Sequence, residues 1–584
     1  MLFSYPLSNK QQKNIIMKKN IVLLLILSIT GTFILAGCGG GSSSTSTPIN
    51  PTDPTTVNPK VNITNDYQVE SLGIANTINA TVSLGSTPKD LYLVLSNYAT
   101  TSASSTITHN AKVAEIAQSK SILPANFEQK PVILRAPQYV QDFSSKIGTL
   151  LSKASTDQPQ AKTLEVAERS EDIAGDSKTF YLDADGTQST TATARKVISN
   201  ITTDIGSKTL NIWVSNDSFD SGSGCSKSKC VTQTMVDQLA DTFLKENLDN
   251  DIYDWATNIY EAEWGDDTND YTGLISANDE ITILLTDIDG DNSPTGGVIG
   301  FFWSKDNFAN TTISGSNERI MFYADAVMFA NGEAGWDIDD FWPKEMVSTL
   351  AHEFQHMINF YQKRILLDTD LDTWINEMLS ETTEDIIATK IKHIGPRGVE
   401  YTDGSAGDPG NTDGRYPLFN ENNTLSLTTW NNQLEDYSKV NAFGTYLIRN
   451  YGGAKLLHDI MHNTYVNEQA IVDAVNKPEE VAGKTFNNLL SEWGTAVLLS
   501  SIESPGNLPT YNTGDFTDSQ HNGTTYEMGS INFFNYDPLP TIHTKAGTVQ
   551  AQGNYYYKIG DNLTGDIIID LKLNGQTEAT LIAK

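Results

Sequence analysis

Apolar residues recur at two spacings along this chain of 584 residues, and the spacings separate predicted strands from predicted helices. Short apolar runs between turn residues predict strands, whereas apolar residues three or four positions apart predict amphipathic helices. The strand-like runs are 90–99, 130–137, 210–214, 281–285, 298–303 and 319–324. Helical spacing occurs at 231–246 and 251–264 and continues from about 341 to 501. The tail from Asn507 is rich in turn residues and ends in three alternating runs, 554–560, 565–574 and 577–583.

These segments predict an α+β protein with several domains, which agrees with the length of the chain. We divide it into a leader (1–37), a flexible tether (38–60), a β-rich region (61–177), a central domain (178–505) and a small β module (506–584). The β-rich region is either an accessory domain or a removable pro-segment. We find no convincing internal repeat.

The helical segment that follows Asp339 and Asp340 contains the sequence HExxH, formed by His352, Glu353 and His356. Two imidazoles four residues apart lie on one face of a helix and can bind one metal ion. Glu353 lies roughly 100° further round the helix, so it can act on a water molecule instead of the metal. The alternative is a helix with two incidental histidines.

A second helical pattern, WINEMLSE, begins at Trp374 and supplies a third ligand for such a site. Catalytic zinc sites take three protein ligands and leave a fourth position open, and Glu377 is the natural third ligand. Glu381 lies one turn further on the same face, where it could hydrogen-bond the distal nitrogen of a ligating histidine. The alternative is a solvated acidic helix, because Glu384 and Asp385 follow closely.

The two motifs together resemble the gluzincin metallopeptidases, of which thermolysin is the best-known type, and in particular the hyicolysin branch. The similar segments are TLAHEFQHMINFYQK (349–363), TWINEMLSETTED (373–385), GFFWSKD (300–306) and LNIWV (210–214). The resemblance spans roughly residues 178–455. It implies a thermolysin-like zincin domain, with an α/β first half and a mostly helical second half, flanked by β-rich modules.

The resemblance also implies a zinc endopeptidase in which Glu353 takes a proton from water and returns it to the leaving amine. Tyr437 resembles the tyrosine that donates to the oxyanion in aminopeptidase-type gluzincins, or it is simply an aromatic residue at a helix start. His393 and Tyr446 are the alternative donors. The edge of a sheet at 300–303 could pair with an extended protein or peptide substrate.

Two other functions remain open. An aminopeptidase of the same clan fits the spacing of Tyr437, although the sequence lacks the Gly-x-Met-Glu-Asn segment that anchors a free amino terminus in that family. The second alternative is a non-catalytic surface-binding lipoprotein on a protease scaffold. The presence of Glu353 argues against it, because a binding protein does not need this base. A second His-x-x-x-His pair, His458 and His462, carries Asp459 where a base would stand and is expected to be a surface pair of imidazoles.

The amino terminus predicts the compartment. Lys18 and Lys19, an apolar run from 21 to 35 and the sequence LAGC form a bacterial lipoprotein signal in which Cys38 becomes lipidated. The apolar run is short for a transmembrane helix. We therefore expect an extracytoplasmic protein anchored by lipid to an outer membrane or cell surface, whose only membrane contact is this anchor.

Cysteine usage and charge fit that compartment. Cys225 and Cys230 lie in a Gly/Ser-rich loop and predict a small disulfide in an oxidising environment. The net charge of −33 disfavours nucleic acid and anionic membrane surfaces as partners. The alternating carboxylates Asp287, Asp289 and Asp291 follow a predicted strand and are either a candidate calcium site or a plain solvated turn.

Overall fold

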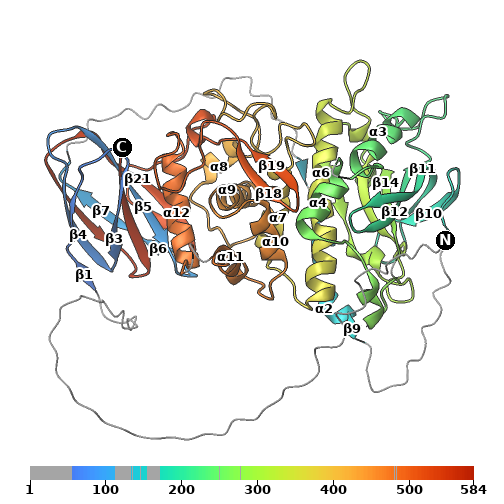
Figure 1. Cartoon of the computed structure of the whole chain (residues 1–584), viewed down its shortest axis with the longest axis horizontal. Coiled ribbons are helices and arrows are strands. Elements are labelled where there is room, and N and C mark those ends of the chain that lie inside the picture. Colours follow the sequence, from blue (N-terminus) through green and yellow to red (C-terminus); the bar gives the residue numbers. More distant parts are fainter. Residues whose placement is uncertain are drawn as a thin grey trace, which may run out of the picture. The chain divides into compact units, whose positions relative to one another are not determined.

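The structure is a computed structural model (Figure 1). It describes residues 55–111, 133–134, 136–144, 146–153, 171–248, 250–276, 278–478, 481 and 483–584. The lipoprotein signal, Cys38 and most of the expected tether therefore lie outside the described residues. Among the described residues, no helix combines the length and the apolar character needed to cross a bilayer.

A six-stranded mixed sheet forms the first half of the central region. Its strand order is β10 (Ser177–Tyr181), β11 (Ser189–Thr203), β12 (Gly206–Ser215), β14 (Glu280–Thr286), β17 (Ile320–Asp325) and β16 (Gly300–Phe302). The strands β12, β14 and β17 are parallel, and the other three pair antiparallel. Every residue of β14 and β17 is buried, as expected for parallel strands covered on both faces. β16 is the edge strand, at the position that the sequence indicated.

Two helices, α3 (Gln233–Phe243) and α6 (Phe341–Asn359), pack beside this sheet, and α4 (Ile252–Tyr260) packs on α6 (Figure 1). Phe354 of α6 anchors the packing, with its ring centroid 5.5 Å from that of Phe243 in α3 and 6.0 Å from that of Phe322 in β17. These contacts bury one face of α6 against the sheet. The opposite face of α6 is therefore directed towards the helical half of the chain.

The second half of the central region is helical, as expected. It contains α7 (Thr373–Ile386), α8 (Tyr416–Asn422), α9 (Leu434–Asn450), α10 (Ala454–Met461), α11 (Glu468–Val475) and α12 (Phe486–Leu499). α7 packs between α6 and α9. Gly444 of α9 permits the close approach to α7, because a Cβ atom at this position would collide with the Thr382 side chain. The chain between α6 and α7 continues as a π-helical stretch, η4 (Phe360–Leu366).

The two predicted β modules form a single two-sheet unit. One sheet contains β1 (Thr56–Val57), β2 (Lys60–Asn62), β4 (Thr77–Ser83), β22 (Asp566–Lys572) and β7 (Thr106–His109). The other contains β21 (Gly553–Leu563), β5 (Lys89–Asn97), β23 (Thr577–Ala583) and β3 (Gln68–Ile74). Inward residues of both ends, such as Val82 and Ile569, share one apolar core. The separate modules expected at 61–177 and 506–584 thus differ from the structure, because strands from the two ends of the chain pair with each other.

The shorter elements connect these parts. They are β6 (Ala103–Ser104), β8 (Ile133–Leu134), β9 (Ser152–Lys153), β13 (Tyr271–Thr272), β15 (Gly297–Val298), β18 (Thr517–His521), β19 (Thr524–Met528), β20 (Thr548–Val549), α1 (Gln138–Ser144), α2 (Ile147–Leu150), α5 (Ala326–Phe329), η1 (Asp266–Asp270), η2 (Ile288–Gly290), η3 (Ser304–Asn307) and η6 (Phe533–Asn535). The hairpin β18–β19 packs on α10 and α7 of the helical half, and the Tyr526 hydroxyl also donates to the Trp255 carbonyl of α4 at 2.9 Å. The part of the tail before β20 therefore belongs with the central region.

Candidate metal centre

His352 and His356 lie one turn apart on the face of α6 that is directed towards α7. The helix begins after Asp340, in agreement with the acidic residues at the predicted start, and Pro343 lies in its first turn. The two ring centroids are 4.9 Å apart, and the ring planes cross at 77°. His352 is fully buried, and the side chain of His356 is 11% exposed. Only one of the two rings is therefore open to a cavity.

Glu377, in the second turn of α7, meets both imidazoles. Its Oε2 atom lies 3.3 Å from Nε2 of His352 and 3.4 Å from Nε2 of His356. The structure thus brings together the three residues that the sequence nominated as metal ligands. The close packing of α6 against α7 places them there.

These three residues fit a zinc ion. The buried atoms Nε2 of His352 and Oε2 of Glu377 have no hydrogen-bond partner among the described residues. Zinc binds nitrogen and oxygen at about 2.1 Å, and at that length a tetrahedral arrangement places neighbouring ligand atoms ~3.4 Å apart. Two imidazoles and one carboxylate are also a ligand set of catalytic zinc sites. The donor types and their separations therefore agree with a site for this metal.

Without a bound metal ion, the electrostatics of the site favour an imidazolium at His352 next to the carboxylate of Glu377. Burial alone lowers the pKa of His352, but contacts with Glu377 and Glu384 outweigh it and raise the pKa to about 10. Burial alone raises the pKa of Glu377, but the charges and close contacts of His356 and His352 lower it to about 2. A metal ion must displace the proton of His352 to bind there, because only the neutral imidazole is a ligand.

Glu353 lies beside the three ligands and is also buried. The backbone N–H of Phe302, in the edge strand β16, donates to its Oε2 atom at 3.0 Å. Its Oε1 atom has no hydrogen-bond partner among the described residues. Burial raises the pKa of this carboxyl group, although the neighbouring histidines oppose the shift. One oxygen of Glu353 is therefore fixed by the sheet, and the other is available for a proton.

The carboxylate that contacts the distal nitrogen of His352 is Glu384. Its Oε1 atom lies 2.9 Å from Nδ1 of His352, whereas Oε1 of Glu381 is 3.9 Å away. Glu381 instead accepts two hydrogen bonds of 3.0 Å from Arg415. The structure thus corrects the position expected for the orienting carboxylate, because the α6–α7 packing presents Glu384 to this ring and directs Glu381 to the arginine.

Ser380 is a further contact that the sequence did not reveal. Its hydroxyl lies 3.2 Å from Nδ1 of His356, and it also hydrogen-bonds Gln355. Glu384 could have been found from its spacing, because it lies two helical turns after Glu377 on the same face of α7. No comparable signal in the sequence distinguishes Ser380.

The comparisons with known proteins agree with this geometry. The family model described as peptidase M30 matches residues 187–523, which is more than half of the chain. The chain belongs to the peptidase M30 family. A curated relative is the neutral metalloprotease ShpI of Staphylococcus hyicus, which is 26% identical over 220 residues. The match spans 36% of this chain and 45% of that relative, so about half of the relative's length is covered.

Tyr437 of this M30 chain lies next to the three ligands. It is in the first turn of α9, and its ring centroid is 6.5 Å from that of His352. Its hydroxyl donates to Oδ1 of Asn432 at 3.3 Å. The two alternative donors lie elsewhere: Nε2 of His393 faces Glu345 at 3.4 Å, and Tyr446 is buried with its hydroxyl near Glu492. Of the three candidates, Tyr437 is the one placed at the site.

Helix α1 covers the cavity next to the candidate metal centre. This cavity of about 290 Å³ is lined by Glu353, His356, Glu377 and Phe302, and also by Val140, Gln141, Ser144 and Ile147 from α1 and α2. Gln141 donates from Nε2 to Oδ1 of Asn432 at 2.8 Å, the atom that Tyr437 also contacts. Just before α1, β8 pairs in parallel with β15, next to the edge strand. The described residues 133–134, 136–144 and 146–150 therefore lie where an extended substrate would approach β16.

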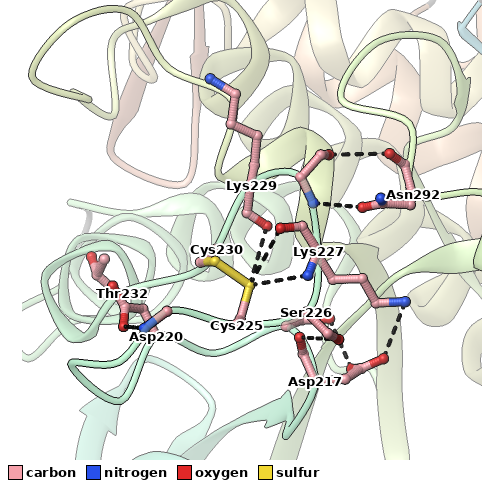
Figure 2. Close-up of a disulfide and its surroundings, with 12 residues drawn as sticks. Asp217, Asp220, Cys225, Ser226, Lys227, Lys229, Cys230, Thr232 and Asn292 are labelled. Atoms are coloured by element: carbon pink, nitrogen blue, oxygen red, sulfur yellow. Dashed lines mark hydrogen bonds and ion pairs between the residues drawn. A yellow bond between two sulfur atoms is a disulfide. The ribbon is translucent and has the colours of Figure 1, made fainter.

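The structure joins Cys225 and Cys230 by a disulfide with Cα atoms 5.8 Å apart, the pairing that the sequence indicated (Figure 2). The loop places Lys227 3.1 Å from Asp217 and 2.6 Å from Asp287. The carboxylate of Asp287 also accepts from the backbone N–H of Asn292. The candidate calcium ligands Asp287, Asp289 and Asp291 do not come together as a metal-binding group among the described residues. The lysine takes the place of a cation beside Asp287.

Proposed function

We propose that this chain is a zinc-dependent endopeptidase that hydrolyses protein or peptide substrates outside the cytoplasm. The observation that carries the proposal is the meeting of His352, His356 and Glu377, with Glu353 on the same cavity. We further propose a thermolysin-like zincin arrangement, in which α6 links the sheet half to the helical half and the site lies between them. The lengths and order of β16, α6 and α7 support this arrangement.

The chemistry follows from the donor set. His352, His356 and Glu377 would hold a zinc ion, which would supply a Lewis acid for the scissile carbonyl and for a water nucleophile. Glu353 accepts the proton of the attacking water at Oε1, because Oε2 is held by the Phe302 N–H. Its raised pKa favours keeping that proton until the leaving amine takes it.

The remaining residues position these groups. Glu384 contacts the Nδ1 atom of His352 and thereby directs its Nε2 atom towards Glu377, and Ser380 packs against the ring of His356. The Tyr437 hydroxyl donates to the oxyanion as the carbonyl becomes tetrahedral. The edge strand β16 pairs with the extended substrate backbone. Calcium is not required by this mechanism.

The decisive experiment replaces Glu353 by Gln. The amide keeps the size of the side chain but accepts no proton, so casein digestion should fall by roughly a hundredfold to ten-thousandfold while bound zinc is unchanged. Glu345→Gln, on the same helix, is the matched control and should digest casein like the parent. Equal turnover by Glu353→Gln and the parent would refute the assigned role.

Product analysis separates the two peptidase classes. An endopeptidase cleaves peptides whose amino terminus is acetylated, whereas an aminopeptidase requires the free amine. Mass spectrometry of the products should show internal cleavage of both acetylated and free peptides. Release of single amino-terminal residues from free peptides alone would favour the aminopeptidase.

Lipid anchoring through Cys38 is part of the proposed function. The disulfide Cys225–Cys230 supports an oxidising compartment. Cys38→Ser removes the acylation site, so metabolic labelling with palmitate should disappear. The Cys225→Ser variant is the control and should keep the label. Persistent labelling of Cys38→Ser would contradict the anchor.

A further inference from the structure

A second group of metal-ligating side chains lies outside the candidate metal centre. His458 is in the last turn of α10, and His462 directly follows that helix. Their rings stack with centroids 4.2 Å apart. The sequence favoured a surface pair, but the structure adds Glu261, which follows α4 and is far away in sequence.

The distances in this group match those of the candidate metal centre. Nε2 of His458 lies 3.5 Å from Oε1 of Glu261, and Nε2 of His462 lies 3.6 Å from Oε2 of the same carboxylate. The corresponding distances around Glu377 are 3.3 and 3.4 Å. Both sets are long for hydrogen bonds and are close to the ~3.4 Å that separates ligand atoms around one tetrahedral zinc ion.

Hydrogen bonds fix the two rings in the form that a metal requires. Nδ1 of His462 donates to the backbone carbonyl of His458 at 2.8 Å, so Nε2 of the neutral ring carries the lone pair. This Nε2 atom is buried and has no hydrogen-bond partner among the described residues.

His458 is held in a similar way. Its Nδ1 atom lies 3.3 Å from Oδ1 of Asp459, and the Asp459 carboxylate is itself paired with Lys455 at 2.5 Å and Lys477 at 3.0 Å. A carboxylate behind a ligating imidazole is a common feature of zinc sites. Asp459 is therefore suited to orient the His458 ring as a metal ligand.

The backbone of Glu261 gives an independent reason for a carboxylate at this position. Its φ of 66° and ψ of −160° lie in a region that is almost restricted to glycine. Glycine is also the usual residue where a helix ends with positive φ. A glutamate in this strained conformation has its carboxylate next to both imidazoles. Binding of a metal ion by the carboxylate would offset the cost of the strain.

We propose that Glu261, His458 and His462 bind a second zinc ion that ties the end of α4 to α10. α4 packs on α6 in the sheet half, and α10 belongs to the helical half, so the ion stabilises the contact between the two halves. His521 is a neighbour and not a ligand, because its ring centroid is 5.6 Å from that of His458 and its Nε2 accepts from Asn522. The fourth position is open to water.

Metal content of the whole purified chain tests the proposal. After incubation with Zn²⁺ and removal of the excess, the parent should hold two equivalents by plasma mass spectrometry. His462→Ala and His352→Ala should each hold one, and the double variant none. His543→Asn is the matched control, because this ring stacks on Tyr555 far from both groups in sequence, and it should hold as much zinc as the parent.

The variant Glu261→Gly separates loss of metal from loss of folding. Glycine relieves the backbone strain, so the metal-free Tm should rise or stay unchanged, whereas the increase in Tm caused by Zn²⁺ should shrink. Co²⁺ bound to His352→Ala should give visible absorption bands that Glu261→Gly removes. If His462→Ala and Glu261→Gly hold as much zinc as the parent, the proposal is wrong, whatever the outcome at Glu353.

Discussion

Nδ1 of His352 lies 2.9 Å from Oε1 of Glu384, and Oε2 of the same carboxylate accepts a hydrogen bond of 2.6 Å from the hydroxyl of Ser348. Ser348 and His352 are one turn apart on α6, so Glu384 is held at two points by the helix that carries both histidines. This arrangement fixes the ring of His352 with Nε2 directed towards Glu377.

The Glu384→Gln variant should therefore bind zinc more weakly. Loss of a partner behind a ligating histidine typically costs about 10- to 100-fold in metal affinity. Competition with a chromogenic chelator measures this affinity. Glu381→Gln is the comparison, because it disturbs the pair with Arg415 and should lower the free energy of unfolding more than the zinc affinity. A larger loss of zinc affinity in Glu381→Gln would restore the assignment made from sequence.

Zinc binding to the metal-free protein should release a proton at pH 8. The raised pKa of His352, about 10, keeps the ring protonated there, and Glu377, with a pKa of about 2, is already ionised. Calorimetry in buffers with different heats of ionisation counts the protons. The release should shrink in His352→Ala. Zinc binding at pH 8 without proton release would contradict the paired imidazolium.

The same pair predicts how the stability of the metal-free protein depends on pH. The folded pKa of His352 is higher than its ordinary value of 6.5, so its contribution is complete below 6.5 and is lost as the pH rises through about 10. Urea unfolding of the metal-free chain at pH 6 and pH 10 should show this loss. Acid unfolding should instead reflect Glu377, whose contribution is lost as the pH falls from about 4.5 towards 2.

Local patterns predicted the parts of the site that lie on single helices. The spacing of His352 and His356, and the acidic pattern that contains Glu377, were readable because each motif repeats with the period of one helix. Which acid of α7 contacts His352 was not readable. Glu381 and Glu384 are similar in sequence, and the choice between them depends on how α7 packs against α6.

Contacts between segments that are distant in sequence account for the other differences between the predictions and the structure. β4 pairs with β22, almost the full length of the chain away, so each end alone reads as a separate β module. Asp287 resembles a calcium ligand in sequence, but the disulfide loop brings Lys227 to it. Glu261 completes a group with His458 and His462 only after α4 and α10 have packed together.

Displacing α1 should increase the activity on large substrates. Val140 is buried beside the cavity, and Val140→Asp buries a carboxylate in its place, at a cost of at least roughly 1–3 kcal/mol. That cost corresponds to a shift of about 5- to 150-fold towards a displaced α1. The ratio kcat/KM for casein should rise accordingly, and Val140→Ile should leave it unchanged. A fall in kcat/KM at unchanged zinc content would show that α1 forms part of the substrate site.

Tyr437→Phe tests the oxyanion donor. The ring of Tyr437 packs 4.9 Å from that of Trp430 and 6.5 Å from that of His352, and Phe preserves both contacts. Only the hydroxyl is lost, and in the resting structure it donates to Asn432. If this hydroxyl moves to the oxyanion in the transition state, the variant should lose about 2–4 kcal/mol of transition-state stabilisation, seen as a lower kcat with little change in KM or zinc content.

Asn432→Asp is the informative partner variant, because a carboxylate would hold the Tyr437 hydroxyl more firmly in its resting position. Asn432→Asp should therefore lower kcat in the parent and have no further effect in Tyr437→Phe. Parent-like turnover by Tyr437→Phe would mean that another group stabilises the oxyanion.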